Sequence, residues 1–149
     1  MSREKMYAAL SDAVANVFSL MPEGPLPETG ADGNAASVAN LFTASVRVES
    51  EGREFSLHMS ASAALCHKVL AKLFPGETSA PSAEQDTLGE LLNLVVESTR
   101  TLLRQQGLPV EVGVPAPVPT PVSPPEDVDV LELSQLGEPL QLWLVELAR

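Results

Sequence analysis

The sequence has little of several residue types, and each shortage argues against a class of protein. It contains one cysteine, Cys66, so no disulfide can form within the chain. That cysteine and the two histidines, His58 and His67, make a structural zinc site improbable. Basic residues are also scarce. Nine Lys and Arg against 20 Asp and Glu give a formal net charge of −11, which argues against nucleic acid or an anionic membrane surface as a partner.

Long hydrophobic runs are missing as well. No apolar stretch is long enough to cross a bilayer, and the first ten residues lack the apolar core of a signal peptide. We therefore expect a soluble, cytoplasmic protein. Aromatic residues make up only 4% of the chain, so Leu, Val and Ala must fill most of the core. A length of 149 residues with 44% hydrophobic content favours a single globular domain covering residues 1–149.

The first 60 residues predict a helix followed by a hairpin. Apolar residues recur at helical spacing over residues 2–21, and a Gly- and Pro-rich loop follows at 22–36. Hydrophobic and polar residues then alternate over 42–49 and again over 55–60. The dipeptide Glu51-Gly52 between them predicts a tight turn.

Two helices are predicted next. Residues 61–74 have helical spacing, Ser60 or Ser62 can cap the start, and Pro75-Gly76 ends the element. After a loop at about 76–81, a helix of some 24 residues runs to Gly107 and Pro109. Its continuous apolar stripe consists of Leu88, Leu91, Leu92, Val95, Val96, Thr99, Leu102 and Leu103.

The remaining chain predicts about three strands. A short strand at 110–114 precedes a proline-rich connection at about 115–125, which we expect to be an extended edge or an exposed segment. Strand alternation resumes at 128–130, and a turn follows at 136–139. Residues 140–147 favour a strand buried on both faces, with a short helix as the alternative. Together these elements predict an α+β fold: a mostly antiparallel sheet of about five to six strands packed with three helices.

The long helix carries a polar stripe opposite its apolar one. Successive helix residues turn by about 100°, so residues three and four apart are neighbours. Glu90 and Asn93 should therefore point to solvent side by side. An ordinary solvated face would show the same pattern, and periodicity alone favours that interpretation. The members of the stripe are Asp86, Glu90, Asn93, Glu97, Arg100 and Arg104.

Residues 86–93, DTLGELLN, resemble the signature of the CheC/CheX family of chemotaxis phosphatases. That signature is an Asp or Ser, three residues, Glu, two residues, Asn, and a proline about 22 residues later. Asp86, Glu90 and Asn93 fill the first three positions. Pro115 follows Asn93 after 21 intervening residues, and Pro117 follows after 23. The motif occurs once, which resembles the single-site CheX branch.

The resemblance implies a CheC-like fold and hydrolysis of the phospho-aspartate of a CheY-like response regulator. Asn93 would position the attacking water, and Glu90 would form a salt bridge to the regulator's active-site lysine. Asp86 and Pro115 would be supporting residues, Asp86 also stabilising the helix start and Pro115 shaping a strand end. The resemblance further implies a homodimer, with residues 140–147 or an unpaired edge strand as the contact. No cofactor of the chain's own is expected, because magnesium would be bound to the regulator.

Two other interpretations stay open. The chain could be a non-catalytic interaction or structural module of the same fold, similar to the middle domain of flagellar switch proteins. Alternatively, an unrelated scaffold could match the motif by chance. A retained Glu90 and Asn93 pair favours the phosphatase, because a purely structural module has no need of it.

Overall fold

A computed structural model describes residues 3–20, 41–73, 83–118 and 122–147 of the chain. The described part contains three helices and six strands, which confirms the predicted fold class. None of the three helices is both long and apolar enough to span a bilayer. In chain order the elements are α1 (Arg3–Ser19), β1 (Leu41–Ser50), β2 (Arg53–Ser62), α2 (Ala63–Leu73), α3 (Ala83–Gln105), β3 (Glu111–Val112), β4 (Ala116–Val118), β5 (Val130–Gln135) and β6 (Glu138–Glu146).

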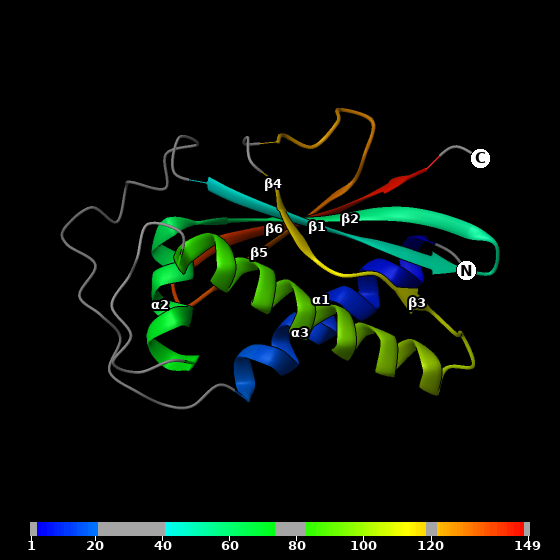
Figure 1. Cartoon of the computed structure of the whole chain (residues 1–149). Coiled ribbons are helices and arrows are strands. Elements are labelled where there is room, and N and C mark those ends of the chain that lie inside the picture. The colour runs from blue at the N-terminus through cyan, green and yellow to red at the C-terminus, as the bar shows by residue number, and fades with distance from the viewer. Residues whose placement is uncertain (1–2, 21–40, 74–82, 119–121, 148–149) are drawn as a thin grey trace.

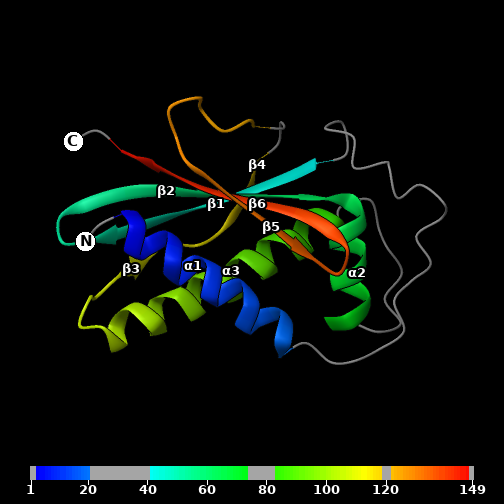
Figure 2. The ribbon, with the colours of Figure 1, turned by 180° about the vertical axis from the view of Figure 1, so that it is seen from behind.

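All strand pairs of the sheet are antiparallel, and the strand order is β3-β1-β2-β6-β5. Strand β4 also pairs with β1, so β3 and β4 together form one edge of the sheet. All three helices lie on the same side of the sheet (Figures 1 and 2). On the other side, the segment from residue 122 to β5 arches over the strands, drawn in orange (Figure 1).

Two tight turns set the register of the hairpins. In the β1–β2 turn Glu51 has φ 51° and Gly52 has φ 77°. In the β5–β6 turn Leu136 has φ 54° and Gly137 has φ 77°. Two consecutive positive φ values define a two-residue turn whose twist matches that of the flanking strands, and glycine tolerates this conformation without steric cost. Both turns were predicted from the sequence and are confirmed.

The core lies between the sheet and the helices. Alternate residues of β1, β2 and β6 point toward α1 and α3, where they pack on the apolar stripes of the helices. Burying these side chains is the main term that stabilises the fold, at about 25 cal/mol per Å² of apolar surface. The central residues of this core are Leu10, Val14, Val46, Leu57, Met59, Leu92, Val95, Leu142 and Leu144.

Trp143 is fully buried, but it lies on the face of β6 that points away from the helices. Its cross-strand partner is His58 on β2, and the two rings stack with centroids 5.3 Å apart and planes 5° apart. The burial of Trp143 agrees with the prediction that residues 140–147 form a strand buried on both faces. The alternation of β6 places it with His58 rather than in the main core.

Several predicted boundaries shift. Helix α2 begins at Ala63 rather than residue 61, because the side-chain oxygen of Ser62 accepts a hydrogen bond from the Leu65 amide at 3.1 Å and caps the helix. Strand β5 begins at Val130, so Val128 lies outside it. Within the proline-rich connection, residues 116–118 pair with β1 as an edge strand.

The segment 140–147 forms a strand that has neighbours on both sides over most of its length. Its strand prediction is confirmed, since β6 covers residues 138–146. Strand β6 pairs with β2 on one side and β5 on the other, and its central side chains are buried within the chain. Residues 144–146 extend past the end of β5 and have no strand partner on that side among the described residues. A homodimer contact through this segment or through an edge strand stays a prediction.

Candidate functional site

Helix α3 is fixed in orientation by its apolar stripe. Leu88, Leu92, Val95 and Val96 are all at most 2% exposed and belong to the main core. The helix ends where predicted: the Gly107 amide donates to Arg104 O at 2.9 Å, and the Leu108 amide donates to Leu103 O at 2.9 Å. With one face buried, the opposite polar stripe must face outward.

Glu90 and Asn93 are both exposed on that outward face, as the spacing predicts. Asp86 lies one turn earlier and is exposed too. Within the described part of the chain neither the Glu90 nor the Asn93 side chain makes a hydrogen bond or an ion pair. Glu97, by contrast, lies 3.6 Å from Arg100 in an ion pair. The two motif side chains are therefore free to engage another molecule.

The structure brings all four predicted residues to one open hollow of about 410 Å³ between α3 and the β3–β4 edge. Pro115 thus lines the same hollow as Glu90 and Asn93, although 21 residues separate it from Asn93 in the sequence. The eight lining residues are Gln85, Asp86, Gly89, Glu90, Asn93, Val114, Pro115 and Pro117.

A β-bulge shapes the edge-strand side of the hollow. On one side of the bulge Val112 pairs with Val48, and on the other side Ala116 pairs with Ser45. Three edge residues, 113–115, therefore lie opposite two residues of β1, 46–47. The Gly113 amide keeps its ladder hydrogen bond to Arg47 O at 2.9 Å. The extra residue therefore lies at 114–115, where a proline is tolerated because a bulge leaves one residue unpaired.

Val114 is a feature of the site that the motif did not identify. It lines the hollow opposite Glu90 and Asn93, and 88% of it is exposed. Sequence alternation alone would place an apolar residue of a strand on the buried face. The only available signal was the position of Val114 directly before a proline in a proline-rich edge.

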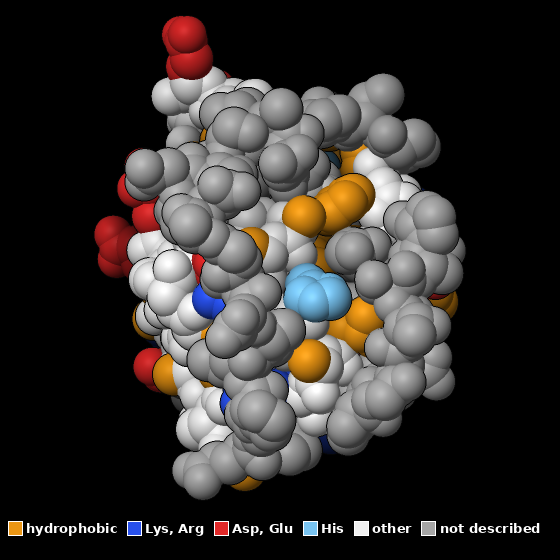
Figure 3. All heavy atoms as spheres, turned by 90° about the vertical axis from the view of Figure 1, so that its left-hand side faces the viewer, with side chains coloured by type: hydrophobic (Ala, Val, Ile, Leu, Met, Phe, Trp, Pro, Cys, Tyr) orange, Lys and Arg blue, Asp and Glu red, His pale blue; other side chains and the backbone are white. Residues whose placement is uncertain are grey.

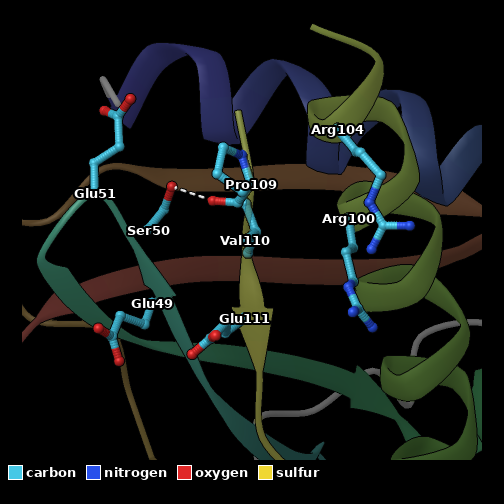
Figure 4. Close-up of a pocket in the computed structure, with 8 residues that line it drawn as sticks. All are labelled: Glu49, Ser50, Glu51, Arg100, Arg104, Pro109, Val110 and Glu111. Atoms are coloured by element: carbon cyan, nitrogen blue, oxygen red, sulfur yellow. Dashed lines mark hydrogen bonds between the residues drawn. The ribbon is translucent and has the colours of Figure 1, made fainter. Parts of the chain in front are cut away.

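A second hollow of about 400 Å³ lies at the other end of α3. Figure 4 shows Arg100 and Arg104 extending from α3 on one side, with Glu49 and Glu111 on neighbouring strands across from them. The Ser50 hydroxyl donates to Pro109 O at 2.8 Å at its edge. This hollow contains none of the motif residues, and its guanidinium and carboxylate groups favour no one sign of ligand charge.

The surface charge of the described part is mainly negative. Figure 3 looks onto the end of the molecule that carries α2 and shows Asp and Glu side chains along one border, in keeping with the net charge of −11. Among the described residues no group of three or more His, Cys, Asp or Glu side chains is arranged to hold a metal ion. Asp86 and Glu90 add a local negative charge to the first hollow.

Comparison of the fold with solved structures gives matches over nearly the whole chain. A CheC-like superfamily protein from Shewanella sp. PV-4 matches with a TM-score of 0.70 and 15% identity, over 99% of this chain and 100% of that one. A chemotaxis protein CheX from Desulfovibrio desulfuricans matches with a TM-score of 0.67 and 15% identity, over 95% and 98%. The crystal structure of a CheX–CheY–BeF3–Mg²⁺ complex from Borrelia burgdorferi gives a TM-score of 0.63 and 14% identity, over 96% of each chain.

The chain therefore has the CheC-like fold, and the CheX chemotaxis proteins are among the structures that share it. This confirms, at the level of the fold, the resemblance that the motif predicted. No family model and no curated protein matches the sequence.

Proposed function

We propose that this protein binds a CheY-like response regulator and accelerates hydrolysis of its phospho-aspartate. The observation that carries the proposal is the placement of Glu90, Asn93, Asp86 and Pro115 around one open hollow on a CheC-like fold. A structural neighbour described as a CheX–CheY complex supports a regulator of this class as the partner.

Asn93 is the residue proposed to act on the reacting atoms. An acyl phosphate is already reactive, so catalysis chiefly requires a water held in line with the phosphorus. The Asn93 carboxamide can accept a hydrogen bond from that water through its oxygen and donate one through its nitrogen. Water then adds to phosphorus as the phosphorus–oxygen bond to the aspartate breaks, which releases inorganic phosphate and restores the carboxylate.

Glu90 is proposed to hold the partner. Its exposed carboxylate, one turn before Asn93, is suited to pair with a lysine beside the phosphorylated aspartate. That contact would orient the docked surfaces so that Asn93 enters the partner's site. Magnesium would be bound by the regulator. The CheX–CheY complex from Borrelia burgdorferi likewise contains BeF3 and Mg²⁺. Asp86 stabilises the start of α3 by about 0.3–1 kcal/mol through the helix dipole.

The test measures dephosphorylation of purified receiver domains from the same organism, loaded with phosphate by a small-molecule donor. Asn93→Ala and Glu90→Gln should both slow the reaction. Asn16→Ala is the matched control for the first, because Asn16 is an exposed helical asparagine on α1. Glu97→Gln is the control for the second. If the parent protein binds a regulator without speeding phosphate loss, the chain is a non-catalytic module of the same fold and the proposed reaction is wrong.

A further inference from the structure

Val114 is the most exposed large apolar side chain in the described part of the molecule. Three such side chains are exposed by 40% or more: Leu20 by 83%, Leu94 by 40% and Val114 by 88%. Of these, only Val114 lines the hollow that contains Glu90 and Asn93. Leu20 and Leu94 line a different hollow, between the helices. An apolar group held in water beside a polar site calls for a physical explanation.

The fold holds Val114 in this position. Directly before it, Gly113 is fixed to β1 by the hydrogen bond to Arg47 O. Directly after it, Pro115 has a restricted φ, and Ala116 resumes pairing with Ser45. A bulge turns a side chain away from the direction that regular alternation would give it. The exposure of Val114 is thus a consequence of the bulge, anchored on both sides.

The same edge is unsuited to pairing with a strand of another molecule. Pro117 lies opposite Ala44 within an antiparallel ladder, and proline has no amide hydrogen to donate to β1. Its nitrogen therefore points to the open side of the edge, where a further strand would need a donor. A partner at this edge must bind through side chains, and Val114 is the large exposed apolar side chain there, next to the smaller exposed Ala116 and the ring of Pro117.

We propose that Val114 is a docking contact for the phosphorylated receiver domain, packing against an apolar group next to that domain's phosphorylation site. This inference rests on the proposed function and extends it. The two walls of the hollow then have different roles. The α3 wall, with Asp86 and Glu90, receives a cationic side chain of the partner, and the bulge wall, with Val114, receives an apolar one. Burial of an exposed apolar side chain adds affinity, while the charges fix orientation.

The kinetic signature of this contact differs from that of Asn93. Val114 would touch the partner equally before and during the reaction, so its loss should raise KM and leave kcat unchanged. Asn93 acts on the water, so its loss should lower kcat. Val114 is almost fully exposed, and a substitution there removes no core packing. A change in KM would therefore report docking rather than folding.

The experiment compares Val114→Ser, Val114→Ile and Leu94→Ser in the dephosphorylation assay. Titration of the same proteins with a beryllofluoride-loaded receiver domain gives Kd in parallel. Val114→Ser should raise KM and Kd about tenfold, equivalent to about 1.4 kcal/mol, with kcat within twofold of the parent. Val114→Ile should stay within twofold of the parent in both constants. Leu94→Ser, the exposed control outside the hollow, should do the same.

The two possible failures are distinguishable. If the parent accelerates phosphate loss and Val114→Ser has the parent's KM and Kd, the docking role is wrong and the proposed function stands. If the parent binds the loaded receiver without acceleration, the proposed reaction is wrong, and the Kd of Val114→Ser still decides the docking role. An equal rise in Kd for Leu94→Ser would also overturn the inference, because it would mean that apolar exposure in general drives binding.

Discussion

Removing the carboxylate of Glu138 should destabilise the protein far more than removing one from the surface. Lys68 on α2 places its Nζ 3.1 Å from Glu138 Oε1 at the start of β6. It also donates a hydrogen bond to Leu136 O at 2.9 Å, within the β5–β6 turn. The two side chains are only 10% and 13% exposed, so water screens the pair weakly. This contact ties α2 to the end of the sheet.

The size of the effect follows from what remains after the substitution. Glu138→Ala leaves the Lys68 ammonium group buried with a hydrogen bond to the Leu136 carbonyl but without the Glu138 carboxylate beside it. Breaking a buried pair in this way costs about 3–5 kcal/mol, whereas an exposed pair is worth about 0.2–1 kcal/mol. Because the carbonyl still stabilises the ammonium group, we expect the lower end, about 3 kcal/mol. Replacing both residues removes the uncompensated charge, so Lys68→Met with Glu138→Ala should recover much of the loss.

Urea unfolding at pH 7 measures these differences as shifts of the midpoint at constant m-value. The four proteins of the cycle are the parent, the two single variants and the double variant. Glu146→Ala is the surface control, because its ion pair with Arg53 at 2.8 Å has side chains 38% and 39% exposed. A Glu138→Ala variant no less stable than Glu146→Ala would refute the reasoning. So would a double variant whose loss equals the sum of the two single losses.

Three further predictions concern other parts of the fold. The Tyr7 hydroxyl accepts a hydrogen bond from the Leu144 amide at 3.0 Å and donates one to Asp129 O at 2.7 Å, which links β6 to the chain before β5. Tyr7→Phe should therefore lower the free energy of unfolding, measured with urea, by about 1–3 kcal/mol. Burial lowers the pKa of His58 below its ordinary value of 6.5. Below about pH 6.5 the unfolded chain therefore takes up a proton at His58 that the folded chain does not, so the free energy of unfolding should fall as the pH drops. A His58→Phe variant, which keeps a ring against Trp143, should show a smaller fall between pH 7 and pH 5.5 in the same assay. Light scattering after size exclusion should show a homodimer at micromolar concentration, and a monomer would contradict that expectation.

The features that were predicted correctly depend on neighbours in sequence. The exposed position of Glu90 and Asn93 follows from the 3.6-residue period of α3, and its end follows from Gly107. The two hairpin turns follow from Gly52 and Gly137, which occupy positive φ. Each of these patterns is complete within a few residues, so no knowledge of the rest of the fold is needed.

The features that were missed depend on contacts between distant segments. The bulge at 114–115 exists only relative to the register of β1, more than 60 residues earlier in the chain. The apolar character of residues 140–147 predicted burial but not a place between β2 and β5. The exposure of Val114 results from the bulge and was hidden for the same reason. The spacing from Asn93 to Pro115 differs by one residue from the signature, and this difference was the one feature of the sequence that pointed to an irregular strand.

The most direct test of the central claim is the rate constant for phosphate loss from a receiver domain, measured with the parent protein, with Asn93→Ala and with Asn16→Ala. If Asn93 positions the attacking water, Asn93→Ala should reduce the acceleration roughly 100-fold, the loss typical of removing one positioned polar group from a reacting centre. Asn16→Ala should match the parent, and both variants should unfold at the parent's urea midpoint. An Asn93→Ala variant as fast as the parent would contradict the account.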